Sequence, residues 1–251
     1  MPSWNIHLEA GNRLADHVKL APKKRQEFLL GCLLPDINNG YVNQPKTVYS
    51  HETTHYAKND KSSLNFYADN ETKIKSRDPL YMGYLFHLFT DGYFNYHFYH
   101  HFDRLPKSRT MTEDQKRAVK HHDFWLYDTN FRHTFDLDPA ALPQIIEKAN
   151  TIKTVAITEE DVKEVSAILE DNSLNDDIKG EDYLFYTEES LGQLLDNTIK
   201  EFICQYLIQD TPGPRPAKEL HDDPTMFVAS NSSEVSSSTV PNPTAKGNHH
   251  A

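Results

Sequence analysis

The stretch from Arg77 to Phe102, RDPLYMGYLFHLFTDGYFNYHFYHHF, constrains this chain more than any other part of its sequence. Asp78 followed by Pro79 predicts that a helix begins there, because an Asp side chain can accept a hydrogen bond from a first-turn amide and Pro fits the first helical position. The residues that follow are too apolar for a surface helix, yet they include several histidines and an aspartate. Polar side chains carried into an interior need partners. The sequence therefore predicts a buried helix with a polar site in it.

The spacing of these polar side chains favours metal binding. At about 100° per residue, His87 and Asp91 lie about 40° apart on one face of a helix, and His101 falls on the same stripe. One cation could therefore contact both His87 and Asp91. His97 lies roughly 80° from His87 on a straight helix, which suits a second ion better than the first. The alternative is a set of core side chains satisfied by ordinary hydrogen bonds.

Helical signals continue along the rest of the chain. Apolar residues recur at intervals of three and four from Trp4 to Val18, with His7 inside the apolar stripe. A second helix is expected to end at Pro35, which would place Asp36 at the start of an irregular loop. Later helices are predicted within residues 112–131, 139–150, 158–171 and 187–210, with capping residues at Thr112, Thr158 and Thr187.

These signals predict an all-α fold. We expect residues 1–210 to form a single multi-helix domain around a buried metal cluster. Residues 211–251 are rich in Pro, Ser, Thr and Asn, and they contain too few large apolar side chains to offset the entropy lost on ordering. This last segment is predicted to be a disordered tail.

The composition limits the partners of the chain. Its formal charge is −11, from 26 Lys and Arg against 37 Asp and Glu, so we expect no nucleic-acid surface and no attraction to anionic membranes. A small phosphorylated or phosphoester substrate remains compatible with that charge, because metal ions would reverse it locally. Neither a signal peptide nor a membrane anchor is evident, and the isolated Cys32 and Cys204 fit a reducing compartment. A soluble cytoplasmic protein is therefore expected.

His51, Glu52 and His55 spell the zincin string H-E-x-x-H, in which a helix presents two histidines to zinc and the glutamate to water. The residues before the string lack the apolar run of a buried helix, and no third histidine follows at the spacing of the longer motif. We therefore predict a polar loop that carries two histidines.

A second run of metal-binding residue types, His121, His122 and Asp123, lies in the predicted helix after Thr112. It resembles the paired His-Asp of metal phosphohydrolases. Adjacent residues point to different faces of a helix, so at most two of the three can share a site. The alternative is a polar run at the surface or partly buried.

Four segments together look like the zinc-dependent phospholipase C family: PSWNIHL at 2–8, LLPD at 33–36, THY at 54–56 and GYLFHLFTD at 83–91. Their order and spacing agree with that family over about residues 1–102. The resemblance implies an all-helical domain, similar in fold to the single-strand-specific nucleases, that holds up to three zinc ions and hydrolyses phosphoesters.

The resemblance also implies which side chains bind the metal. The family pattern H-x3-D-x5-H is matched by His87, Asp91 and His97, with Asp91 bridging two ions by analogy. Asp36 is implied both as a ligand and as the catalytic residue. The full set of metal ligands carried over is His7, Asp36, His55, His87, Asp91 and His97.

The sequence departs from the family pattern at several places. Trp4 is internal, whereas secreted members use the amine of an N-terminal Trp as a ligand. The later H-x3-E pair is missing, so a second ion would need His101, His121 or His122. The loop ligand is left open between His51 and His55.

The function expected from the sequence is a zinc-dependent hydrolase of phosphoesters with two or three ions, in which Asp36 positions the attacking water. The first alternative is a His-Asp-type metal phosphohydrolase that uses His121, His122 and Asp123. The second alternative is a non-catalytic binding protein whose metals only hold helices together.

Overall fold

The computed structural model describes residues 2–57, 61–135, 137–171 and 176–208. Within these ranges the chain forms eleven α-helices, three short helical turns and no strand, as the all-α expectation required. The predicted tail at 211–251 lies outside the described residues. The elements are α1 (Trp4–His17), α2 (Pro22–Gly31), α3 (Leu34–Ile37), α4 (His51–Thr54), α5 (Ser62–Asp69), α6 (Glu71–Lys75), α7 (Pro79–Phe102), η1 (Pro106–Thr110), α8 (Glu113–Asp128), α9 (Leu142–Ala149), α10 (Glu159–Asp171), η2 (Asp176–Ile178), α11 (Glu188–Phe202) and η3 (Ile203–Leu207).

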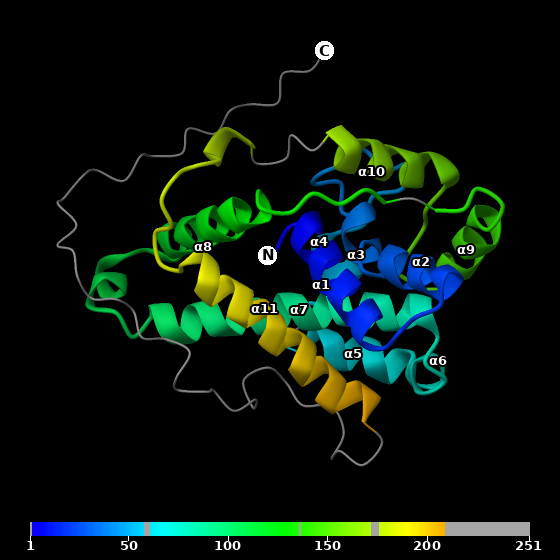
Figure 1. Ribbon diagram of the computed structural model, residues 1–251, viewed down its shortest axis with the longest axis horizontal. Coiled ribbons are helices and arrows are strands. Elements are labelled where there is room, and N and C mark those ends of the chain that lie inside the picture. The colour runs from blue at the N-terminus through cyan, green and yellow to red at the C-terminus, as the bar shows by residue number, and fades with distance from the viewer. Residues whose placement is uncertain (1, 58–60, 136, 172–175, 209–251) are drawn as a thin grey trace.

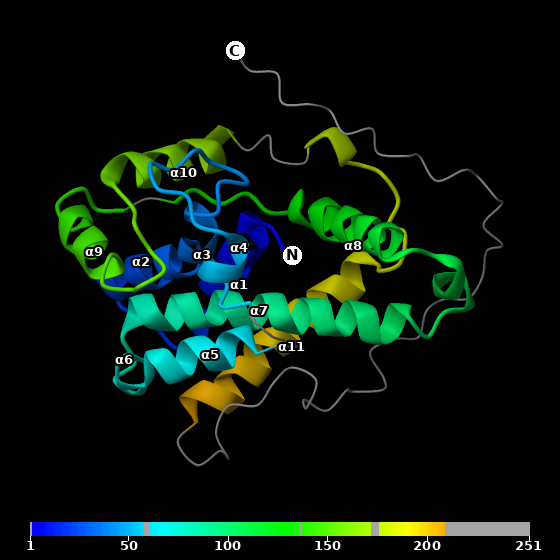
Figure 2. The same ribbon diagram turned by 180° about the vertical axis from the view of Figure 1, so that it is seen from behind.

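Helix α7 is the centre of the fold (Figures 1 and 2). It begins as the sequence predicts, with Asp78 accepting a hydrogen bond from the Leu80 amide at 3.2 Å and Pro79 in its first turn. Every residue from Leu80 to Asp91 is buried, and α7 contacts α1, α2, α3, α5, α6 and α11. None of the helices in the described ranges has the length and apolar character that crossing a bilayer requires.

Two glycines allow α2 and α7 to touch backbone to backbone. A Cβ atom on Gly31 would lie 2.2 Å from the carbonyl oxygen of Leu80, and one on Gly83 would lie 2.0 Å from that of Phe28. Any side chain at either position would push the helices apart. This close crossing brings the end of α2 against the first turns of α7, one turn before His87.

The predicted helix caps are present. Thr112 and Gln115 form a complete capping box at the start of α8. Thr158 and Asp161 exchange hydrogen bonds at the start of α10. Thr187 opens α11 as expected. Capping residues satisfy amides that the first helical turn leaves unbonded, which is why they mark these boundaries well.

Two local predictions were wrong. Pro35 does not end a helix: α2 stops at Gly31, and Pro35 lies in the first turn of α3, where a missing N–H costs nothing. Asp36 is therefore held inside a helical turn and not at the start of a loop. The predicted polar loop around His51 instead begins with one helical turn, α4, because the Ser50 side chain accepts a hydrogen bond from the Thr53 amide.

Candidate metal centre

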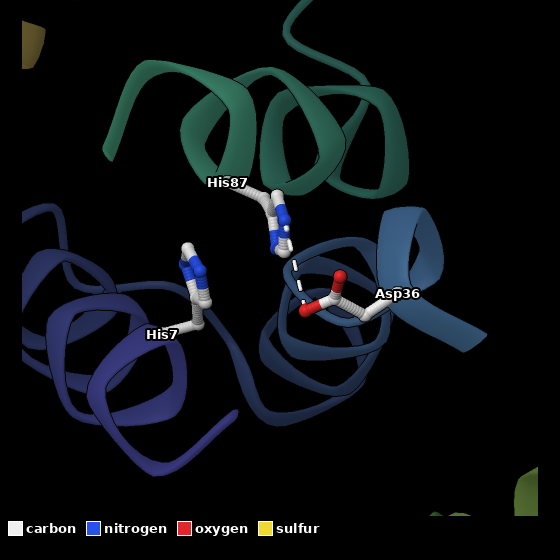
Figure 3. A group of neighbouring side chains, drawn as sticks. All are labelled: His7, Asp36 and His87. Carbon is white, nitrogen blue, oxygen red and sulfur yellow. Dashed lines mark ion pairs between the residues drawn. The ribbon is translucent and has the colours of Figure 1, made fainter. Parts of the chain in front are cut away.

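Five buried side chains from four parts of the chain meet beside α7. His7 comes from α1, Asp36 from α3, His55 from the residue after α4, and His87 and Asp91 from α7. All five are between 0 and 7% exposed. They form two overlapping groups whose ligand atoms lie within 4.8 Å of one another: His7, Asp36 and His87 in one, and His55, His87 and Asp91 in the other. Figure 3 shows the first group converging from three helices.

The distances among His55, His87 and Asp91 match those between ligands of a tetrahedral zinc ion. Its Nε2 atom lies 3.2 Å from Nε2 of His87, 3.3 Å from Oδ1 of Asp36 and 3.4 Å from Oδ2 of Asp91. Nε2 of His87 is also 3.4 Å from Oδ2 of Asp91. Four ligands at zinc distances of about 2.0–2.1 Å from a tetrahedral ion are roughly 3.3 Å from one another. His55, His87 and Asp91 are therefore already spaced as ligands of one ion, while Asp36 approaches Nε2 of His87 only to 3.9 Å.

Asp91 presents its second oxygen to another histidine. Oδ1 of Asp91 lies 3.4 Å from Nε2 of His7, whose ring is stacked on that of His87 at 3.8 Å. Neither oxygen of Asp91, nor Nε2 of His7, makes a hydrogen bond within the described part of the chain. Buried polar atoms are rarely left so, because the loss of solvation is not repaid. A cation bound between them would satisfy all three atoms.

Neighbouring groups orient the histidines and Asp36. Nδ1 of His87 donates a hydrogen bond to the carbonyl oxygen of Cys32 at 2.7 Å, which leaves Nε2, 3.2 Å from Nε2 of His55, as the possible ligand atom in the neutral ring. Nδ1 of His55 is hydrogen-bonded to the Thr54 hydroxyl at 2.9 Å, and the Asn39 amide donates to Oδ1 of Asp36 at 2.8 Å. Because His87 has one free nitrogen, it can bind one ion only.

These supporting groups were not found from the sequence. Thr54 precedes His55 by one residue and Asn39 follows Asp36 by three, so their closeness in sequence could have indicated a supporting role. The carbonyl of Cys32 has no sequence signal, since every residue carries one.

The electrostatics of the centre favour ionised carboxylates. Burial alone would raise the pKa of Asp36, but His87 and His55 outweigh it and hold the pKa at about 2. Burial is likewise outweighed at Asp91, where His87 and His7 keep the pKa well below its usual range. Burial and the neighbouring His87 lower the pKa of His7, so its ring tends to stay neutral. At His87 the effect of burial is outweighed by Asp91 and Asp36, which raise the pKa. Zinc binds the neutral imidazole, so an ion bound here would displace that proton.

The zincin string is not organised as a zincin site. The His51 ring is stacked on that of His55 at 3.9 Å, but His51 belongs to neither group of candidate ligands. Glu52 is exposed to solvent, and α4 is a single turn. Between the two histidines, the geometry thus favours His55 as the ligand and leaves His51 as its stacking neighbour. Burial lowers the pKa of His51 to about 4.

His97 and His101 lie further along α7. His97 is buried, and its ring packs 4.4 Å from that of Tyr93 and 5.7 Å from that of His101. Neither histidine belongs to the two groups formed by the described residues. Their role in binding a second ion stays a prediction.

The residues His121 to Asp123 make structural contacts, mainly with the segment before α11. The fully buried Asp123 accepts hydrogen bonds from the backbone amides of residues 184, 185 and 186, at 2.8, 2.9 and 2.8 Å. His122 bridges Asp123 and Glu181, and the His121 ring packs against Trp125. With its oxygens occupied by amides, Asp123 is an anchor for the segment before α11, and the geometry does not support the His-Asp phosphohydrolase alternative.

Comparison with known families agrees with the metal centre. The family profile for zinc-dependent phospholipase C matches residues 6–180, which is more than half of the chain. This chain belongs to the zinc-dependent phospholipase C family. The match reaches well beyond the first 102 residues, where the recognisable segments lie, and it includes all five side chains of the centre. Comparisons with curated proteins and with solved structures give no match.

Proposed function

We propose that this chain is a zinc-dependent hydrolase of a small phosphorylated or phosphoester substrate. The observation that carries the proposal is the set of buried nitrogen and oxygen atoms spaced at 3.2–3.4 Å around His55. Hydrogen bonds account for only part of this arrangement. Nε2 of His87 is within hydrogen-bond distance of Nε2 of His55, but both oxygens of Asp91 lack a hydrogen bond among the described residues. Family membership supports zinc as the ion.

The side chains divide between two ions in this proposal. His55, His87 and Oδ2 of Asp91 would hold the first, and His7 with Oδ1 of Asp91 would begin the site of the second. Asp36 would lie beside the first, with Oδ1 3.3 Å from Nε2 of His55. Zinc bound there would supply Lewis-acid chemistry, lowering the pKa of a coordinated water to near ~7 and polarising a phosphoryl oxygen. Asp91 balances the charge of both sites with one carboxylate.

Asp36 is the proposed catalytic residue. Its pKa of about 2 keeps the carboxylate ionised at neutral pH. One oxygen is held by the Asn39 amide, and the other lies 3.9 Å from Nε2 of His87. An ionised oxygen that is not held by a strong donor can accept a hydrogen bond from water and orient that water toward a phosphorus atom.

One observation favours the non-catalytic alternative, in which the metal only holds the helices together. Oδ1 of Asp36 lies 3.3 Å from Nε2 of His55. If Asp36 joined His55, His87 and Asp91 on one ion, it would fill the fourth tetrahedral position, and closed sites do no hydrolysis. The two functions differ in stoichiometry, because hydrolysis needs the second, open site at His7.

The test is elemental analysis of the purified chain combined with hydrolysis of a phosphomonoester, a phosphodiester and a short-chain phosphatidylcholine. We expect at least two zinc ions per chain and hydrolysis of at least one of these compounds. The exposed Glu52→Gln variant is the control and should match the wild type. One tightly bound zinc with no hydrolysis of any compound would support the scaffold, and a chain without zinc would refute both.

A further inference from the structure

A lysine of α8, Lys120, is buried against α7. Lys120 is only 6% exposed. Its Nζ atom donates a hydrogen bond to the side-chain oxygen of Asn95 at 2.7 Å and lies 5.0 Å from the centre of the Tyr99 ring. Both partners are neutral. In the described part of the chain, the ammonium group is therefore held in the interior by an amide oxygen and an aromatic face, and by no carboxylate in contact with it.

Other partly or largely covered lysines of this chain are paired with carboxylates. Lys148 contacts Glu27 at 2.7 Å and Asp78 at 2.6 Å, and Lys116, one turn before Lys120 on α8, contacts Asp103 at 2.8 Å. Lys120 has no carboxylate within 4.0 Å among the described residues. A buried charge without a counter-ion is costly, and such groups are concentrated at functional sites.

The residues that Lys120 contacts continue along α7 from the proposed ligand Asp91. Asp91, Asn95 and Tyr99 follow one another at intervals of four residues, so they occupy one stripe of α7. Lys120 contacts the last two, and the first is a proposed ligand. Burial lowers the pKa of Lys120 to about 8, and Asp91 is the attractive charge that opposes this shift. Figures 1 and 2 show α8 running beside the second half of α7, beyond the centre.

We propose that Lys120 binds an anionic oxygen of the substrate's phosphoryl group from the α8 side of the metal centre. This inference rests on the proposed function and adds a binding residue outside the metal ligands. A lysine ammonium has three N–H donors, and Asn95 uses one of them. Two donors remain for an oxyanion, which would also provide the missing counter-charge. Bound metal would balance the charge of Asp91, so this carboxylate would no longer attract the ammonium of Lys120. The electrostatic stabilisation from a bound anion would then be larger.

The test is the binding of inorganic phosphate to the zinc-loaded full-length chain, measured by titration calorimetry and as inhibition of hydrolysis. Lys120→Met removes the charge and suits a buried site, and Lys120→Gln serves if the methionine variant is poorly folded. Lys120→Arg restores a cation. Lys116→Met is the matched control, because it removes a lysine from the same helix that already has carboxylate partners. Zinc content and melting temperature are measured for every variant.

We expect Lys120→Met to weaken phosphate binding about tenfold or more, as the loss of a charge-assisted hydrogen bond predicts, with zinc content unchanged. Lys120→Arg should regain part of the affinity, and Lys116→Met should behave as the wild type. Equal phosphate affinity in the wild type and Lys120→Met would overturn the inference, even if hydrolysis proceeds. Phosphate binding that depends on Lys120 in a chain that hydrolyses nothing would support it and refute the proposed function instead.

Discussion

Asp91 has the most demanding position of any residue in the centre. Its two oxygens face different histidines, Oδ1 toward His7 and Oδ2 toward His55 and His87, each at 3.4 Å. An ionised carboxylate in a buried place without hydrogen bonds loses solvation and gains little in return. The proposed metal ions would supply the compensation that the surrounding side chains do not.

Asp91→Asn is expected to remove metal and activity together. The amide has nearly the same size, but it carries no charge to balance dications and presents one oxygen where the carboxylate has two. We expect a lower zinc content by elemental analysis and a loss of hydrolysis greater than about a hundredfold, the upper range for changes beside metal ligands. The Glu52→Gln variant should keep both. A full complement of zinc in the Asp91→Asn variant would rule out the bridging role.

The buried Lys120 predicts a specific pH dependence of stability. Its pKa is about 8 in the folded chain, compared with ~10.4 for an unfolded lysine. Between these values the unfolded chain binds more protons, so the free energy of unfolding rises with pH. The wild type should therefore gain stability relative to Lys120→Met from about pH 8 to pH 10, measured by urea unfolding with the metal state held constant. A constant difference over this range would show that the lysine is not buried as described.

At the scale of elements, the crossing of α2 and α7 decides whether the centre can form. The helices touch at Gly31 and Gly83, and one residue beyond Gly31 the carbonyl of Cys32 reaches His87. A displaced helix would break that hydrogen bond and separate Asp36 from the ligands on α7.

Gly83→Ala is therefore expected to destabilise the chain by about 1–3 kcal/mol or more, the usual range for overpacking, and to lower its zinc content. The matched control is Gly92→Ala on the same helix, where an added Cβ atom meets nothing within 4 Å. That change should leave the zinc content unchanged and stabilise the helix by roughly 0.5–1 kcal/mol. Thermal unfolding of both variants checks the comparison, and equal melting temperatures would contradict it.

Sequence reasoning located the elements whose signals are local. Asp78, Thr112, Thr158 and Thr187 mark helix starts because a cap depends on residues within one turn. Pro35 was misjudged because proline is compatible both with the end of one helix and with the first turn of the next, and only packing chooses. The short α5 and α6 were not predicted.

The candidate site could be predicted only in part, because local sequence signals do not place residues of different helices relative to one another. His87 and Asp91 share a helix, so their spacing alone placed them on one face. His7, Asp36 and His55 lie on other elements, and a resemblance to the family supplied them. No local rule gives the distances between helices, which is why Lys120 and the Cys32 carbonyl were missed.

At the scale of the whole molecule, the centre ties together segments that are far apart in the sequence. Its proposed ligands come from α1, α3, the residue after α4, and α7, so in the unfolded chain they are not preassembled. Metal that binds only the folded chain stabilises it by mass action.

Removal of metal by exhaustive chelation is expected to lower the melting temperature as well as abolish hydrolysis. At a free concentration a thousandfold above Kd, bound metal contributes about 4 kcal/mol, which corresponds to roughly 8–16 °C for a chain of this size. Differential scanning calorimetry before and after chelation, with zinc added back as the control, measures the shift. An unchanged melting temperature would count against a metal centre built from distant helices.

The hydrogen bond from His87 to residue 32 has a consequence for how the protein tolerates mutation. The acceptor is a backbone carbonyl, so no substitution of Cys32 can delete it. Thr54 and Asn39 support His55 and Asp36 through their side chains, so a single substitution can remove either hydrogen bond. The orientation of His87 is thus protected from direct point mutation. Mutation of Gly31 or Gly83 can still disturb this orientation. Neither glycine is a candidate ligand, but their close packing keeps the Cys32 carbonyl within hydrogen-bond distance of His87.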